Sequence, residues 1–402
     1  MRSLPYCYSI PYCVPYWNHE TYHVIFKRIL SGRVIDGPDT ECLKDRLAKY
    51  FQVPEVIPCG RGRVAIELAL RASGIKEGDE VVVPSFCCPS VIPPVLATGA
   101  EPALADVGDD LIVTAESVER AFTHRTRAVI VPHLFGNPAD IEPIVDYCRR
   151  KEVIVIDDAA QALGATWNGR PLGTFGDAGL VSFGNGKICF GTGGGVLVSR
   201  NPSILEKAKR IPVSRGSLRG GISDALSTLV WRRWRRWSLP LKVGLSKAGL
   251  TMETARTYSR EGMRNLDAAV ALTLLDTLAE NLHARRARVD AYRAFLKEET
   301  RLSLIPHRAG SACLTQVARV NQSDFDGSAV DRIIRVLREK GFEVGRSYRP
   351  LHLAPEYRKF ARVPLEKSDH EWQNLLEFPC EPSVPLSEVK RICQIVTSNL
   401  GR

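Results

Sequence analysis

The sequence VIVIDDAAQALGATWNGRPLGTFGDAGLVSFGNGKICFGTGGGVLVS, residues 153–199, contains two apolar runs that each lead into a reactive side chain. VIVIDD ends in two acids, and GLVSF is followed by GNGK, which ends in Lys187. Short apolar runs bounded by glycine and polar residues are typical of buried strands. The carboxyl ends of parallel strands share one edge of a sheet, where ligands usually bind. We therefore expect Asp158 and Lys187 to point into one crevice.

The same pattern extends upstream to about residue 56. Strand-like runs alternate with helical patterns in the order VAIELALRASG, EVVVP, EPALADV, RAVIVPH, IEPIVDYCRRK, VIVIDD, GLVSF and GVLVS. Such alternation is typical of α/β folds with a mainly parallel central sheet sandwiched by helices. The sequence therefore predicts an α/β domain with its ligand site at the strand ends.

The character of the chain changes after residue 260. LDAAVALTLLDTLAENLHARRARVDAYRAFLKEE, residues 266–299, keeps helical periodicity for about thirty residues. We interpret it as a long helix connecting a large domain, residues 1–255, to a smaller C-terminal α/β domain within residues 256–402. The large domain would include an N-terminal arm and a basic Trp/Arg insertion at 215–255.

Composition narrows the classes of function. The chain has 402 residues, 44% hydrophobic and 25% charged, with a net charge of +10. It shows no apolar run long enough for a membrane span and no signal-peptide core, so we expect a cytoplasmic protein. The positive charge favours anionic partners, but no nucleic-acid-binding motif is present. Eleven cysteines without C-x-x-C or metal-ligand spacing predict reduced thiols and no metal site.

A lysine presented between a strand and glycines is a phosphate anchor or a covalent catalyst. GNGK lacks the spacing of a P-loop, so the phosphate-anchor interpretation fails. Pyridoxal phosphate requires a lysine, a carboxylate for its ring nitrogen and a cradle for its phosphate. The chain offers Lys187, Asp158 and a glycine turn, CGRGRVAIELAL at 59–70, which precedes a helical pattern and would aim N–H groups at an anion.

Taken together, the segments GRGRVAIELALRASG, VIVPHLFGNPAD, VIDDAAQ and SFGNGK resemble the DegT/StrS family of pyridoxal-phosphate-dependent sugar aminotransferases. The resemblance runs from SGRVIDG at 31–37 through the glycines near 195, and it returns in RPLHLAPEY at 349–357. It implies the fold of type I pyridoxal-phosphate transferases, which are similar to aspartate aminotransferase.

The resemblance also implies roles for individual residues. Lys187 would form the Schiff base with the cofactor and then shuttle the proton, and Asp158 would pair with the ring nitrogen. Gln161 would lie near the ring hydroxyl, while Ser182, Gly62 and Arg63 would hold the phosphate. The expected substrate-side residues are His133, Phe86, Tyr348 and His352.

Three positions depart from the family pattern. Arg61 and Arg63 stand where a serine or threonine is common, although an arginine fork can also hold phosphate. Cys88 occupies the place of the aromatic residue that stacks on the cofactor ring, so either Phe86 or the Cys88 thiol covers the ring. The asparagine and arginine that the family contributes across its dimer interface are out of register, and Arg260 or Asn265 would substitute for them.

The reaction implied is transfer of an amino group from an amino acid, expected to be L-glutamate, to a keto sugar linked to a nucleotide diphosphate, in amino-sugar or polysaccharide biosynthesis. Lys187 argues against the family's dehydratase branch, in which the lysine is replaced. Two alternatives stay open: a non-catalytic regulatory or partner protein, and an aminotransferase acting on a cyclitol or another ketone. The resemblance implies a homodimer.

One segment has no counterpart in the family, TLVWRRWRRWSLPLKVGL at 228–245. Trp231, Trp234 and Trp237 recur every three residues and would share one side of a helix, opposite four arginines. Three interpretations remain: packing on the protein or its dimer partner, peripheral contact with the inner face of a membrane, and a cover over the site that holds a diphosphate.

Overall fold

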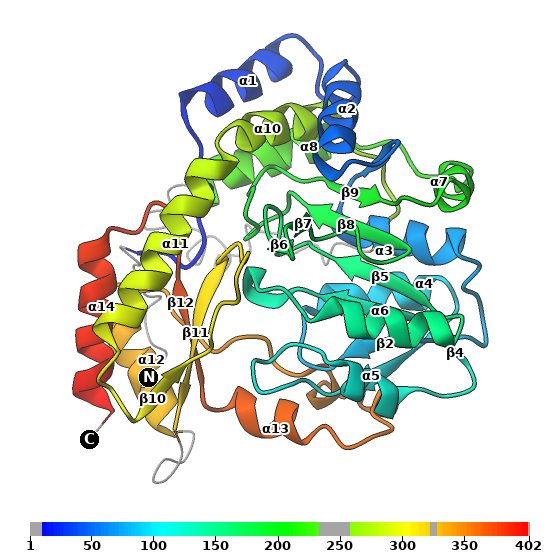
Figure 1. Ribbon diagram of the computed structural model, residues 1–402. Coiled ribbons are helices and arrows are strands. Elements are labelled where there is room, and N and C mark those ends of the chain that lie inside the picture. The colour runs from blue at the N-terminus through cyan, green and yellow to red at the C-terminus, as the bar shows by residue number, and fades with distance from the viewer. Residues whose placement is uncertain (1–9, 233–257, 322–327, 401–402) are drawn as a thin grey trace.

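The computed structural model describes residues 10–232, 258–321 and 328–400 (Figure 1). Most of the segment 228–245 therefore lies outside the described residues, and the three interpretations of it stay predictions. Across the described ranges, every helix is too short or too polar to span a bilayer.

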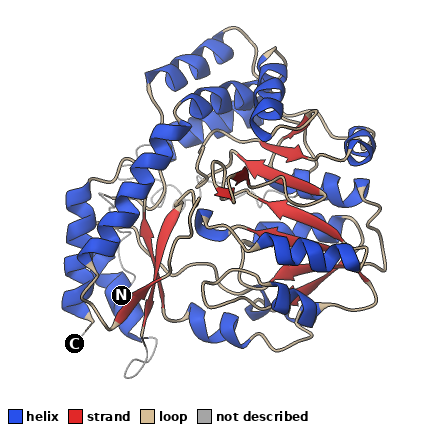
Figure 2. Cartoon of the chain, in the orientation of Figure 1, coloured by secondary structure: helices blue, strands red, loops and turns tan. Residues whose placement is uncertain are grey.

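A seven-stranded sheet forms the core of the larger part of the molecule (Figure 2). Its strands, in spatial order, are β1 (Val56–Cys59), β9 (Gly195–Val198), β8 (Ala178–Ser182), β5 (Ile154–Asp158), β4 (Thr126–Pro132), β2 (Glu80–Pro84) and β3 (Glu101–Ala105). Neighbours from β8 to β3 pair in parallel, whereas β9 runs opposite to β8 and β1. The predicted α/β fold with a mainly parallel sheet is confirmed.

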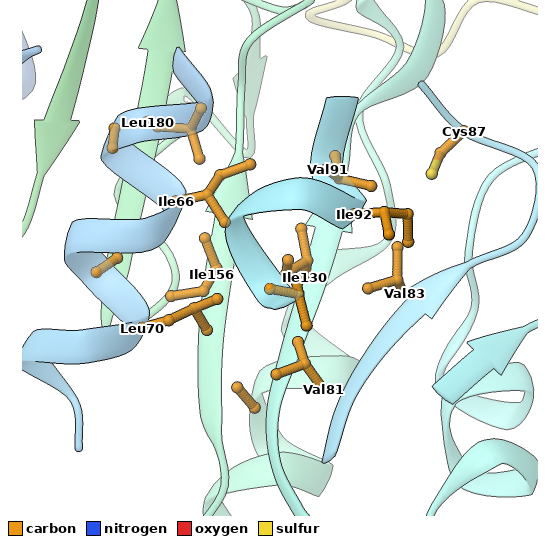
Figure 3. Close-up of a cluster of buried hydrophobic side chains, with 14 of the residues drawn as sticks. Ile66, Leu70, Val81, Val83, Cys87, Val91, Ile92, Ile130, Ile156 and Leu180 are labelled. Atoms are coloured by element: carbon orange, nitrogen blue, oxygen red, sulfur yellow. The ribbon is translucent and has the colours of Figure 1, made fainter. Parts of the chain in front are cut away.

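Helices cover both faces of this sheet because its strands are apolar on both sides. Val83, Ile130 and Ile156 join one buried cluster with helices α3 and α4 (Figure 3). The alternating residues Val82 and Val155 join a second cluster with α5 and α6. Continuously apolar strands of this kind are typical of parallel sheets buried on both faces.

The helices before the small unit are α1 (His19–Leu30), α2 (Asp39–Phe51), α3 (Gly62–Ala72), α4 (Ile92–Ala97), α5 (Ala115–Ala121), α6 (Ile141–Arg150), α7 (Pro202–Lys209), α8 (Leu218–Leu226) and α10 (Asn265–Asp276). Short helical turns form η1 (Pro89–Val91), η2 (Leu134–Gly136) and η3 (Ser227–Arg232), and a two-stranded hairpin pairs β6 (Thr166–Trp167) with β7 (Arg170–Pro171). Helix α10 packs against α1 and α2 beside the sheet (Figure 1).

The C-terminal part builds a smaller unit around a three-stranded antiparallel sheet. Its elements are α11 (Leu278–Phe295), β10 (Leu302–Leu304), β11 (Thr315–Val320), α12 (Ser328–Glu339), η4 (Leu351–Leu353), η5 (Arg358–Phe360), α13 (Glu366–Trp372), β12 (Leu375–Pro379) and α14 (Leu386–Asn399). Helices α11 and α14 lie side by side against this sheet (Figure 1). The N-terminal arm also contacts this unit, because Ile10 pairs with Phe342 in a β-bridge.

The long connecting helix differs from the prediction. Residues 266–299 were expected to form one helix, but two helices meet at Thr277, whose backbone (φ −101°, ψ 10°) leaves helical geometry. The apolar α10 is buried against α1 and α2, whereas α11 extends to α14. Helical periodicity continues through a change of direction, so it could not reveal the break.

Candidate active site

The carboxyl ends of β4, β5 and β8 open into one pocket of about 720 Å³. Of the predicted site residues, the structure brings together in its wall Gly62, Arg63, Cys88, His133, Asp158, Gln161, Ser182, Lys187 and Tyr348. Strand alternation explains the shared direction of two of them. Asp158 follows Ile156 by two residues and Ser182 follows Leu180 by two, and both apolar residues face α3.

The neighbouring acids Asp157 and Asp158 face opposite sides of β5 and have different surroundings. Asp157 is fully buried, and its carboxylate accepts hydrogen bonds from His133 Nε2 at 2.7 Å and the Phe175 N–H at 2.8 Å. The Asp158 carboxylate accepts one from the Ala160 N–H at 2.9 Å and faces the pocket. Asp157 therefore supports the strand ends, and Asp158 is directed toward a ligand.

Burial raises the pKa of Asp158, an effect that the Ala160 N–H and the charge of Lys187 only partly oppose. A buried carboxylate whose ionised form is costly gains from a cation placed beside it. A protonated pyridine nitrogen is such a cation.

His133 follows β4 and lies in the pocket wall with both ring nitrogens occupied. Nδ1 accepts a hydrogen bond from the Ala139 N–H at 2.9 Å, which assigns the proton to Nε2, the atom that donates to Asp157. The ring therefore presents carbon atoms rather than an acid or base to the pocket. We assign His133 to positioning Asp157 and to packing.

The predicted phosphate cradle lies where α3 begins. A Cβ atom on Gly62 would lie 3.0 Å from Ser182 Cβ, and one on Gly195 would lie 2.4 Å from the Gly62 nitrogen. These close approaches bring the start of α3 against Ser182 in the pocket wall. The first N–H groups of a helix have no partner within the helix, and such groups bind anions.

Lys187 lies on the loop between β8 and β9, half-buried in the pocket wall. Elements distant in sequence hold this loop. Asn281 on α11 donates to the Ile188 carbonyl at 3.1 Å, and the indole of Trp17 donates to the Phe190 carbonyl at 2.8 Å. The amine therefore projects from a loop that is fixed on its C-terminal side.

Gln161, Tyr348 and Cys88 form one side of the pocket. The Gln161 carbonyl accepts from the Phe135 N–H at 3.0 Å, and its amide donates to the Tyr348 hydroxyl at 3.0 Å. The second amide hydrogen of Gln161 has no assigned acceptor among the described residues, and it suits a ring hydroxyl.

Two predicted substrate residues lie outside the pocket within the described structure. Phe86 is fully buried and packs against Phe135, with ring centroids 6.4 Å apart. The ring nitrogens of His352 bind Ser85 Oγ at 2.6 Å and Asp369 Oδ1 at 2.7 Å. Phe86 therefore belongs to the core and His352 to a structural polar cluster. Cys88 lines the pocket, and its packing against the cofactor ring stays a prediction.

Arg260 and Asn265, the expected substitutes at the dimer interface, are engaged within their own chain. Arg260 forms an ion pair with the buried Glu67 at 3.1 Å. Asn265 is fully buried and bonds the backbone N–H of Asp39 and the carbonyl of Arg33, both at 2.9 Å. Asn265 is therefore unable to reach a partner subunit, which corrects this expectation.

Sequence reasoning missed a polar wall made by the N-terminal arm and the small unit. The Tyr12 hydroxyl donates to the carboxylate of Glu377, and the Tyr12 N–H donates to Glu343 at 3.0 Å; all three side chains line the pocket. The signal for Glu377 is present in the sequence as one acid inside the apolar run LLEFP. Tyr12 carries no such signal, because it lies 365 residues from its partner.

The pocket fits pyridoxal phosphate. It combines a lysine, a buried carboxylate that gains from a cation, and a glycine cradle at a helix N-terminus in which a side chain would clash. The residues that would hold the cofactor are Lys187, Asp158, Gln161, Ser182, Gly62, Arg63 and Cys88, and these assignments stay predictions.

Comparison with known proteins agrees with this chemistry. Residues 18–397 match the model of the DegT/DnrJ/EryC1/StrS aminotransferase family. The chain belongs to this family. The family relationship predicted from the sequence is confirmed, and the protein is an aminotransferase by family.

Relatives and solved structures extend over almost the whole chain. GDP-perosamine synthase of Caulobacter vibrioides is 30% identical and covers 86% of this chain and 85% of its own; that of Vibrio cholerae is 28% identical, with 91% and 90% covered. The aminotransferase TlmJ of Streptoalloteichus hindustanus has a TM-score of 0.78 at 25% identity, covering 97% of this chain and 98% of its own. DesV of S. venezuelae, solved with a ketimine intermediate, has a TM-score of 0.75 at 26% identity, covering 95% of each chain.

Proposed function

We propose that this protein is a pyridoxal-phosphate-dependent aminotransferase that transfers an amino group from L-glutamate to a keto sugar linked to a nucleoside diphosphate. The observation that carries the proposal is the meeting of Lys187, Asp158 and the Gly62–Ser182 cradle in one pocket. The family relationship supports the reaction class, and the relatives named GDP-perosamine synthase support a nucleotide-linked acceptor.

Pyridoxal phosphate, when bound, supplies an electron sink for the bond-breaking step. The residues of the chain do the rest. Lys187 would hold the cofactor covalently, and its amine, once free, would carry the proton between the substrate carbon and the reacting carbon of the cofactor. The Asp158 carboxylate stabilises the positive ring nitrogen. Gly62, Ser182 and Arg63 bind the phosphate, and Cys88 packs against the ring.

The polar wall suits the acceptor. Carboxylates accept hydrogen bonds from sugar hydroxyls, and phenols both donate to them and accept from them, so the ligand needs no charge. Glu343, Glu377 and Tyr12 therefore favour a hydroxylated ring over a second amino acid. We also propose that the active form is a homodimer.

The proposal is tested by incubating the protein with pyridoxal phosphate, [15N]glutamate and GDP-4-keto-6-deoxy-D-mannose, and analysing the nucleotide sugar by mass spectrometry. We expect a 15N-labelled amino sugar from the wild type and none from Lys187→Ala. UDP- and dTDP-linked keto sugars serve as further acceptors. Absence of label from every nucleotide-linked acceptor would overturn the proposed substrate class.

A further inference from the structure

A second recess, of about 420 Å³, adjoins the pocket that holds Lys187. The two share Arg61, Arg63 and Asp224 in their walls. The remaining lining residues of the second recess are Ser217, Arg219, Gly220, Ser223, Ser259, Glu261 and Arg264. Four arginines thus face two acids, so the recess carries a net positive charge suited to an anionic ligand.

A chain of ion pairs fixes two of these arginines. Asp224 accepts from Arg61 Nη2 at 2.8 Å and from Arg264 Nη2 at 2.9 Å, and Asp267 accepts from Arg264 Nε at 2.6 Å. Arg264 is 5% exposed, so little of its side chain is accessible to a ligand. The Arg61 side chain is 30% exposed, and its ion pair with Asp224 orients the guanidinium group. Arg61 lies at the border between the two recesses.

Arg219 differs from the other three. It is exposed in the first turn of α8, and no hydrogen bond or ion pair from it to another described residue is present. Arg219 and the oriented Arg61 therefore offer two guanidinium groups along one recess. Guanidinium groups bind phosphate oxygens through paired, charge-assisted hydrogen bonds.

We propose that the second recess binds the diphosphate of the nucleotide-linked substrate, with Arg219 and Arg61 as its ligands and Asp224 as a positioning residue. The cofactor phosphate is the other source of the same chemistry, but its cradle at Gly62 and Ser182 belongs to the first pocket. Because the recesses are joined at Arg61, a substrate can place its sugar near Lys187 and its diphosphate in the second recess. This inference rests on the proposed function.

Binding of GDP, UDP and dTDP to the cofactor-loaded protein, measured by titration calorimetry, tests the site. We expect at least one of these diphosphates to bind the wild type, and Arg219→Gln to weaken that binding by about tenfold or more. Arg215→Gln is the matched control, because Arg215 lies in the same segment, pairs with Asp36 and is absent from the lining of the recess. We expect Arg215→Gln to bind like the wild type.

A second arm separates the two sources of phosphate. Affinities for pyridoxal phosphate and for pyridoxal, which lacks the phosphate, are compared in the wild type and Arg61→Gln. We expect Arg61→Gln to weaken diphosphate binding while the preference for pyridoxal phosphate over pyridoxal changes less than threefold. Loss of that preference with unchanged diphosphate binding would assign Arg61 to the cofactor and overturn its role here.

The inference fails if none of the three diphosphates binds the wild type, or if Arg219→Gln binds them normally. Failure of the proposed function gives a different result, because the visible spectrum of the loaded protein would then not respond to L-glutamate. A protein whose spectrum responds to glutamate but which binds no nucleoside diphosphate would contradict only the proposed role of the second recess.

Discussion

At the residue scale, the candidate site depends on two adjacent acids with opposite roles. Asp157 is buried among donors that it satisfies, and Asp158 is buried at a pocket wall where burial raises its pKa. The two acids in the sequence DD do not by themselves show which one faces the site. Once the strand is assigned, strand alternation shows it, because Asp158 lies on the same face as the apolar Ile156.

This contrast predicts different effects of two similar substitutions. Asp158→Asn should leave the cofactor-free protein at least as stable, because the amide oxygen still accepts from Ala160 and the costly charge is gone. Its affinity for pyridoxal phosphate should fall by about tenfold or more. Thermal unfolding without cofactor and a cofactor titration measure the two effects.

Asp157→Asn should instead lower the free energy of unfolding by about 2–4 kcal/mol, because the amide faces a donor where the carboxylate accepted. The interpretation of the pair would be contradicted if Asp158→Asn proved the more destabilising substitution in the cofactor-free protein.

Glu377 predicts a pH dependence. Burial raises its pKa from 4.5 to about 7, although the Tyr12 hydroxyl lowers it by donating to the carboxylate. The folded state therefore binds this proton more tightly than the unfolded state, and the associated stability is complete below pH 4.5 and lost as pH rises through 7. The difference corresponds to about 3 kcal/mol.

In Glu377→Gln this contribution is absent. Denaturant unfolding should therefore show the variant gaining stability relative to the wild type between pH 5 and pH 8, by up to about 3 kcal/mol. A stability difference that is constant between these pH values would show that Glu377 is already ionised in the folded protein at pH 5.

At the element scale, helix α3 carries the cradle, and Glu67 anchors it. Glu67 is 1% exposed and binds Arg71 at 2.7 Å, Arg260 at 3.1 Å and the Tyr258 hydroxyl. Glu67 therefore connects the helix to the segment around Glu261, whose carbonyl accepts a hydrogen bond from the Gly60 N–H. The strands β2, β3, β4, β5, β8 and β9 and the helices α3 and α6 follow from apolar patterning. This anchor does not, because Tyr258 and Arg260 are remote in sequence.

Glu67→Gln should destabilise the protein by about 2–4 kcal/mol, because two arginines lose the charge of their buried partner. Glu41→Gln is the control. Glu41 forms an exposed ion pair with Lys44, and its loss should cost less than about 0.5 kcal/mol. If the two substitutions lowered the thermal stability of the protein equally, the proposed anchoring role of Glu67 would be contradicted.

At the scale of the whole molecule, the site is assembled from segments that local patterns cannot relate. The motifs near Gly62, Asp158 and Lys187 were predictable because each follows or precedes a regular element. Tyr12 and Asp224 were not, since their place depends on the packing of the arm and α8, whereas the acid inside LLEFP marks Glu377 without showing what it faces. The same limit explains why the predictions for Phe86 and His352 were wrong. Aromatic and imidazole side chains are common in ligand sites, but the neighbours of these two residues give them structural roles.

Assembly is also a property of this scale. Large apolar side chains are exposed on α1, at Phe26 and Leu30, and at the two ends of α8, at Leu218 and Leu226. Burial of such side chains against a second copy would be favourable. We expect sedimentation equilibrium to give twice the chain mass of 44.5 kDa. A monomer at micromolar concentration would contradict the proposed homodimer.

The visible absorption spectrum of the protein with pyridoxal phosphate, before and after addition of L-glutamate, tests most directly whether Lys187 is the catalytic lysine. A yellow band that requires Lys187 and bleaches with glutamate is the predicted result. A band that forms equally well in Lys187→Ala would contradict the assignment of the lysine, and a band that glutamate leaves unchanged would contradict the proposed amino donor.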